Sequence, residues 1–318
     1  ILIKVLGTKR VMKLFPPAVC GPLIILIGIN LAGSAIDNLF TNWMLGIVPI
    51  LVIIICNTWG KGMIKIIPVL ISLIVSYIVA IIMGAVDFSA VGSANWVGLP
   101  NFHLPKFNAD AIVAGLAVAV AAMVEHVGDV MAIGATCGKN FIADPGLTRT
   151  LLGDGIGTSL AGLLGGPANT TYSENTGVVA LTRVFDPFVM RIAAVMAIIL
   201  SLSPKFEAVI NSIPAAIIGG ISFVLYGMIA ATGIRTIVEN QVDYVNMRNV
   251  LITAIILVSG LGFNHKNIVI GSVAFGGLAC AAVFGIILNA ILPGKDYKFD
   301  EDKPDDTGVC FAVKGEEN

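Results

Sequence analysis

Hydrophobic and polar positions divide this chain into long uncharged runs separated by short polar stretches. Three clear runs, 14–36, 38–60 and 66–86, are each about 20 residues long, the length of an apolar helix that crosses a bilayer. Later runs predict further helices at 111–134, 151–164, 188–203, 208–234, 249–264 and 267–292. Pro214 should divide the run 208–234 into a short piece and a full span. The pattern predicts an all-α protein with several membrane spans.

One predicted span is interrupted by a segment that resembles neither a helix nor an exposed loop. Gly165-Gly166-Pro167 should end the preceding helix, because proline lacks an N–H and glycine adds backbone freedom. The next residues, Asn169-Thr170-Thr171-Tyr172, are polar and β-prone, which predicts a short extended strand.

A short helix should follow that strand. Ser173 is a good N-cap, Glu174 lies in the first turn, and Asp186-Pro187 stops the helix after Phe185. A helix of about 12 residues spans about 18 Å, too short to cross a bilayer. An extended piece that feeds a half-helix at membrane depth is typical of substrate sites in secondary transporters. A re-entrant structural kink is the alternative interpretation.

Composition agrees with a membrane protein: 57% of the residues are hydrophobic, 12% are charged, and the mean hydropathy is +0.93. These values exclude a soluble domain. The net charge of −1 indicates no partner class, and no basic patch points to nucleic acid. The five cysteines occur singly, without metal-ligand spacing, and are interpreted as small core residues.

The distribution of Lys and Arg predicts the orientation. If residues 1–13 are cytoplasmic, alternation of the spans puts twelve Lys and Arg inside and three outside (Lys106, Lys205 and Lys266). This positive-inside bias predicts ten membrane segments, counting the half-helix, with the N-terminal loop and the tail 293–318 in the cytoplasm. The loop 87–110 should be extracellular.

A faint internal repeat points to a transporter design. Pro17-Ala18 with Gly21, Gly28 and Ala32 recurs as Pro214-Ala215 with Gly219, Gly227 and Ala231 after a slip of two residues. Inverted repeats are common in transporters. If 107–292 is one complete repeat, the partner of the broken segment should lie N-terminal to Ile1.

The polar chemistry concentrates in the helix predicted at 111–134. Glu125 follows fourteen uncharged residues, and Asp129 lies one turn further on the same face, with His126 turned about 100° away. An acidic side chain at membrane depth marks a substrate or proton pathway, or a structural hydrogen bond between helices. His126 is more often a packing or orienting residue. A metal site is an alternative, but no further His or Cys cluster supports it. Tyr226 lies mid-span and reaches either a polar site or a neighbour in the core.

These residues and their neighbours resemble a known protein family. Glu174-Asn175-Thr176-Gly177-Val178-Val179-Ala180-Leu181-Thr182-Arg183 matches the nucleobase–ascorbate transporter signature without a mismatch, and Glu125-His126-Val127-Gly128 resembles the other core helix of its bacterial uracil permeases. Asp144-Pro145-Gly146-Leu147, Asn169-Thr170-Thr171-Tyr172 and Gln241-Val242-Asp243-Tyr244 resemble the family as well. The likeness runs from residue 1 to about residue 292.

The resemblance implies an inverted-repeat fold of fourteen segments, seven in each repeat, in which a core domain faces a gate domain. This chain would match segments five to fourteen, with the end of the fourth in residues 1–13. The implied division is three spans in 14–86, mostly gate domain; core-domain spans with the substrate site in 111–203; gate-domain spans in 204–264; and the last span in 267–292. A chain that begins at Ile1 is expected not to transport alone.

The resemblance also implies roles for single residues. Glu125 and Glu174 would contact the base, and Ser173 and Tyr172 would line the site. Asn175, Gly177, Thr182 and Tyr226 would support it. Asp129 departs from some uracil permeases, which have histidine there, and is common in purine transporters. Glu174 points the other way, because purine members usually have glutamine.

The expected function is uracil import by proton symport at the plasma membrane, not catalysis. Desolvation should favour the protonated form of Glu125, so this residue, with Asp129 and His126, is the expected proton-coupling group. No cofactor beyond the proton is expected. The expected partners are the nucleobase and the lipid bilayer, with a homodimer left open. Alternatives are a purine or xanthine transporter of the same family, an anion transporter of the same fold, a membrane metalloenzyme, or an inert fragment.

Overall fold

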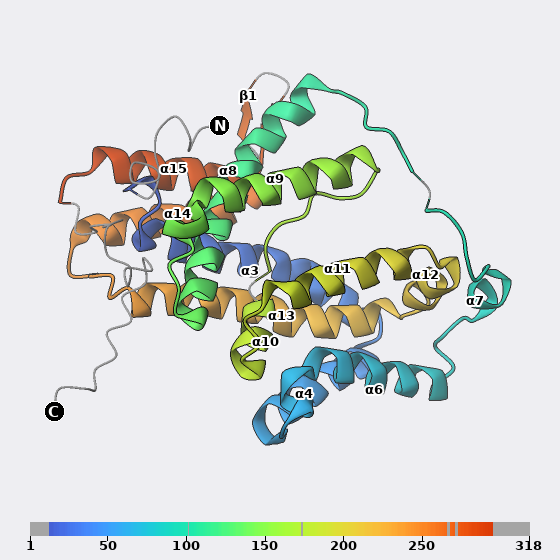
Figure 1. Ribbon diagram of the computed structural model, residues 1–318. Coiled ribbons are helices and arrows are strands. Elements are labelled where there is room, and N and C mark those ends of the chain that lie inside the picture. Colours follow the sequence, from blue (N-terminus) through green and yellow to red (C-terminus); the bar gives the residue numbers. More distant parts are fainter. Residues whose placement is uncertain (1–12, 101, 173, 266–267, 271–272, 295–318) are drawn as a thin grey trace. The chain divides into compact units, whose positions relative to one another are not determined.

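The structure is a computed structural model that describes residues 13–100, 102–172, 174–265, 268–270 and 273–294. Ser173, residues 1–12 and the tail from 295 lie outside the described residues. The described helices and strands are α3 (Pro17–Phe40), α4 (Trp43–Trp59), α5 (Met63–Ile66), α6 (Pro68–Ile82), α7 (Ser89–Ser93), α8 (Ala109–Cys137), η1 (Ile142–Gly146), α9 (Leu147–Leu163), α10 (Glu174–Thr182), α11 (Pro187–Ser201), α12 (Pro204–Asn211), α13 (Ala215–Glu239), α14 (Met247–His265), β1 (Ile268–Ile270), β2 (Val273–Phe275) and α15 (Gly277–Ile291) (Figure 1). The helical character predicted from the sequence is confirmed.

The chain forms two compact units that interleave along the sequence. The first unit contains the described parts of 1–30, 103–177 and 228–318, and the second contains those of 31–102 and 178–227. Helices α3, α10 and α13 each contribute to both units. Every site residue on α8 and α9 therefore belongs to the first unit.

Three helices in the described part of the chain, α3, α13 and α14, are long and apolar enough to cross a membrane. A fourth span results if α11 and α12, which meet at a 91° bend, are taken together. Many large apolar side chains on the helices are exposed, including Leu70 and Ile78 on α6 and Ile198 on α11. Exposed apolar surface of this extent is typical of helices that face lipid.

The core of the first unit joins α3, α8, α14 and α15. Its fully buried members include Leu23 from α3, Val127 from α8 and Ile256 from α14. Helices α14 and α15 pack against each other (Figure 1). A methyl group at Gly277 of α15 would collide with the carbonyl oxygen of Gly260 in α14, so glycine is what permits this close approach.

A buried arginine joins the ends of these helices. Arg248, at the start of α14, donates to the carbonyl oxygens of Asn289 (3.1 Å) and Leu292 (3.4 Å) at the end of α15. It also donates to the side-chain oxygens of Asn249 (3.1 Å) and Asn289. Asn289 in turn donates to the carbonyl oxygens of Lys13 (2.9 Å) and Leu14 (3.3 Å). The guanidinium thus satisfies carbonyls that a helix C-terminus leaves without a partner.

The second unit has a smaller core of its own. Leu45 and Ile53 of α4, Ala80 of α6, and Ala216 and Ile217 of α13 are buried in it. Helices α4 and α6 pack together. The predicted break at Pro214 is confirmed, because α12 ends at Asn211 and α13 begins at Ala215.

The single span predicted over 267–292 is wrong in its first part. Residues 268–270 and 273–275 pair as antiparallel strands, with Ile268 opposite Phe275 and Ile270 opposite Val273. Hydropathy does not separate the hairpin from the helix, because both are apolar. The signal lay instead in the β-branched residues on either side of Gly271-Ser272, a sequence typical of a two-residue hairpin turn. Helix α15 is therefore only 15 residues long.

Candidate functional site

Helix α8 carries the three polar residues that the sequence predicts for the site. His126 and Asp129 are buried, with exposed fractions of 3% and 8%, and Glu125 is half-buried. The helix is regular from Ala109 to Cys137, so Glu125 and Asp129 lie one turn apart on one side of it. Buried ionisable groups in an apolar helix are costly and are retained for function or for pairing.

His126 faces α9 rather than the solvent. Its Nδ1 lies 3.2 Å from Oδ2 of Asp154, which sits in the middle of α9. A carboxylate at one ring nitrogen fixes the orientation of an imidazole and the nitrogen that carries its proton. The interpretation of His126 as an orienting residue agrees with this contact, whereas its role in proton coupling remains a prediction.

Asp154 is the site residue that the sequence analysis missed. It stands in the run Leu151-Leu152-Gly153-Asp154-Gly155-Ile156, where it is the only polar residue. The same reasoning that singled out Glu125 at membrane depth applies to it. What the sequence did not offer was the pairing with His126, which only the packing of α8 on α9 reveals.

Helix α9 ends as predicted at the Gly-Gly-Pro segment. Gly165 has φ = +86°, a left-handed conformation that favours glycine, and the N–H of Gly166 donates to the carbonyl oxygen of Ala161 over 2.8 Å. The N–H of Gly165 donates to the carbonyl oxygen of Gly162 over 3.2 Å. These two bonds form the helix-ending Schellman motif and turn the chain into the segment 166–172.

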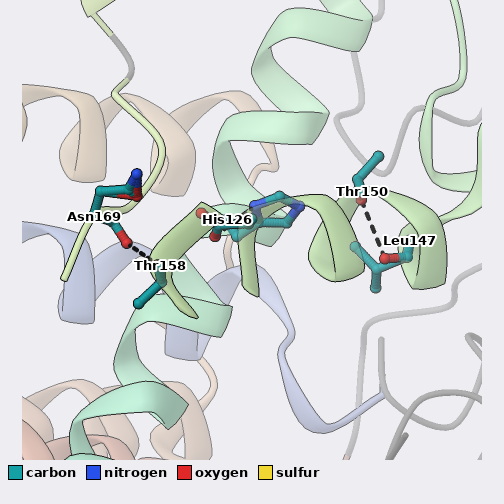
Figure 2. A network of polar contacts seen from close by, with 6 residues as sticks. His126, Leu147, Thr150, Thr158 and Asn169 are labelled. Carbon is teal, nitrogen blue, oxygen red and sulfur yellow. Dashed lines mark hydrogen bonds and ion pairs between the residues drawn. The ribbon is translucent and has the colours of Figure 1, made fainter. Parts of the chain in front are cut away.

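The segment 166–172 has no strand in the part of the chain that the structure describes. It is held instead by α9, because the Thr158 hydroxyl donates to the carbonyl oxygen of Asn169 over 2.7 Å (Figure 2). The side-chain oxygens of Thr170 and Thr171 are buried without a hydrogen-bond partner among the described residues. The predicted break between the two helices is therefore present, and the assignment of this segment as a strand is not supported.

The half-helix predicted after this segment is α10, and it begins at Glu174 as expected. It is nine residues long rather than twelve, because it ends at Thr182 and Arg183 adopts φ = +55°. The prediction that it is too short to cross a bilayer holds. Tyr172, just before it, is 63% exposed.

The residues predicted to support the site lie in different local environments. The N–H of Asn175 donates to the carbonyl oxygen of Tyr172 over 3.4 Å, and Gly177 lies inside α10. Thr182 donates to the carbonyl oxygen of Val178 in its own helix over 2.8 Å. Tyr226 is half-buried in α13, within the second unit, so its part in the site remains a prediction.

A metal site finds no support in the geometry. Within the described ranges, no group of three or more His, Cys, Asp or Glu side chains is placed to hold an ion.

Comparison with known proteins identifies the family to which the chain belongs. A model described as the permease family matches residues 1–268. The chain belongs to the permease family. The uracil permease of Bacillus subtilis (strain 168) is 40% identical over 312 residues, which cover 92% of this chain and 72% of that protein. The probable uracil permease of Haemophilus influenzae is 40% identical over 301 residues, with the same coverage.

A third relative is the putative pyrimidine permease RutG of Escherichia coli (strain K12). It is 38% identical over 301 residues, covering 91% of this chain and 67% of that protein. The family predicted from the signature is thereby confirmed.

Proposed function

We propose that this permease carries uracil across the membrane by proton symport with alternating access. The observation that carries the proposal is the convergence on α9 of the two elements that bear the predicted base contacts. Asp154 of α9 meets His126 beside Glu125, and Thr158 of α9 holds the segment that leads into Glu174. The names of the relatives described above, uracil and pyrimidine permeases, point to the same substrate.

The chemistry of uracil fits such a site. Its edge presents N–H donors between carbonyl acceptors. Carboxylates accept from the N–H groups, and the first turn of a helix has N–H groups without intrahelical partners that are able to donate to a carbonyl.

Coupling to protons follows from the cost of charge at membrane depth. Protonation of Glu125 would remove that charge before the carrier reorients. One proton per cycle draws about 1.4 kcal/mol per pH unit and about 2.3 kcal/mol per 100 mV. Either source suffices for concentrative uptake. The proposal includes a fold of two inverted repeats with seven segments each, and it places both chain termini in the cytoplasm.

A purine transporter is the second candidate. The observation in its favour is Asp129, a buried acidic group one turn from Glu125, at the position where purine members commonly have aspartate. An anion transporter of the same fold is disfavoured, because two carboxylates in the site would repel its substrate.

Uptake into proteoliposomes tests the proposal. Protein from the complete gene is reconstituted, a pH gradient is imposed, and accumulation of labelled uracil is followed with and without excess unlabelled xanthine. Accumulation of labelled xanthine is followed in a parallel experiment. Uracil should accumulate with the gradient and resist xanthine competition. Accumulation of xanthine in place of uracil would establish the purine alternative, and no accumulation of either base would refute the proposal.

A further inference from the structure

The structure fixes the segment 166–172 at two points, both on α9. The first is the glycine turn, where the N–H of Gly166 meets the carbonyl oxygen of Ala161 at 2.8 Å. The second lies three residues further, where Thr158 donates to the carbonyl oxygen of Asn169 at 2.7 Å. A Cβ at Gly157, the neighbour of Thr158, would lie 3.7 Å from the Asn169 side-chain nitrogen, so the contact is close along this stretch of α9.

The Thr158 hydroxyl is used differently from other hydroxyls on the same helix. Ser159 donates back to the carbonyl oxygen of Gly155 (2.7 Å) and Thr150 to that of Leu147 (3.1 Å), the usual partners of Ser and Thr in membrane helices. Thr158 instead reaches the carbonyl of Asn169, eleven residues away in sequence. A hydroxyl that bonds outside its own helix links two separate pieces of backbone.

The hydrogen bond between Thr158 and Asn169 lies between the two elements that carry the predicted base contacts. Asp154, one turn before Thr158 on the same face of α9, contacts His126 beside Glu125. Asn169 lies five residues before Glu174, the first residue of α10. One face of α9 therefore sets the places of both elements that carry the predicted base contacts.

We propose that Thr158 is a positioning residue for the base: by holding the Asn169 carbonyl, it fixes where α10 begins relative to α8. This inference rests on the proposed function. Thr158 does not touch the base. Of the two attachments to α9 described above, losing its hydrogen bond leaves the glycine turn, and the start of α10 then samples positions in which Glu174 no longer meets uracil.

Three variants separate this role from a general effect on folding. Thr158→Val keeps the shape of the side chain and removes the donor. Thr158→Ser keeps the donor and serves as the rescue variant. Ser159→Ala is the matched control, because it removes the adjacent hydroxyl that bonds only within its own helix.

Two measurements are made on protein from the complete gene, purified in detergent. Hydrogen–deuterium exchange of the peptide that contains 166–176 is followed without ligand, and the Kd for labelled uracil is determined. Thr158→Val should speed exchange in that peptide and raise Kd about three- to tenfold, the range expected from one hydrogen bond. Thr158→Ser and Ser159→Ala should match the unaltered protein in both.

The outcomes are distinguishable. Unchanged exchange in Thr158→Val would overturn the positioning role, and so would faster exchange with an unchanged Kd. A purely structural role would lower the apparent melting temperature while leaving the Kd of the folded fraction alone, which overturns the proposal too. If the unaltered protein failed to bind uracil, the proposed function would fall, and the exchange comparison would still decide whether Thr158 anchors the segment.

Discussion

Two buried polar clusters in the first unit are built on opposite principles. Around Arg248, the donors meet carbonyl and amide oxygens at the ends of α14 and α15. Around His126, Nδ1 lies at ion-pair distance from Asp154 (3.2 Å), and neither ring nitrogen has a hydrogen-bond partner among the described residues. Buried polar groups are normally paired, so an incomplete cluster is the exception that calls for an explanation.

This difference in hydrogen bonding distinguishes the cluster around Arg248, called the fixed joint below, from the cluster around His126, a site whose partners change. A fully satisfied network is costly to break and holds its helices in one arrangement. An incompletely satisfied one is stable only if a substrate, a proton or water completes it during the cycle. We therefore expect substitutions in the first cluster to act on stability and those in the second to act on transport.

The largest effect is expected from Arg248→Met, which breaks the fixed joint. The substitution leaves the carbonyls of Asn289 and Leu292 buried without their donor. Stability should fall by about 3 kcal/mol, since each unmet buried group costs about 1–3 kcal/mol. The apparent melting temperature in detergent should drop by about 6–12 °C. Arg191→Met, at an exposed position on α11, is the control. A melting temperature equal to that of the control would show that the joint carries no stability.

Asp154→Asn tests the second cluster, the one around His126. Asparagine keeps the size of the side chain and removes the charge that faces His126. Uracil uptake should fall about tenfold or more, because a buried imidazole loses the carboxylate charge that faces it. The melting temperature should change little. The exposed Asp87→Asn provides the matched control. Loss of folded protein together with full activity of the remainder would place Asp154 with the fixed joint instead.

The smallest effect is expected from Asn289→Asp, which tests whether hydrogen bonding or charge stabilises the cluster around Arg248. It adds a countercharge to Arg248 and removes the N–H donor that meets Lys13 and Leu14. If complete hydrogen bonding holds the joint, stability should fall by about 1 kcal/mol in spite of the new ion pair. Thermal unfolding of the purified protein measures this. A rise in stability would mean that charge, rather than pairing of every group, governs the cluster.

Part of the site was predictable because its signals are local. The apolar run before Glu125, the Gly-Gly-Pro break and the start of α10 at Glu174 each depend on neighbouring residues alone. The contact between His126 and Asp154 joins two helices, and no local pattern encodes which residues will meet.

The errors in the fold have a similar cause. The hairpin at 268–275 was missed because hydropathy reads an apolar strand and an apolar helix alike. The half-helix was drawn three residues too long because the left-handed turn at Arg183 has no glycine to mark it. Local composition thus predicted the kinds of elements better than their ends.

The central claim is that Glu125 carries the proton that drives uracil transport. Glu125→Gln mimics the protonated side chain, so proteoliposomes with this variant should still exchange labelled for unlabelled uracil across the membrane. They should not accumulate uracil when a pH gradient is imposed. Accumulation that still follows the gradient would contradict the claim and transfer the role of proton carrier to Glu174 or Asp129.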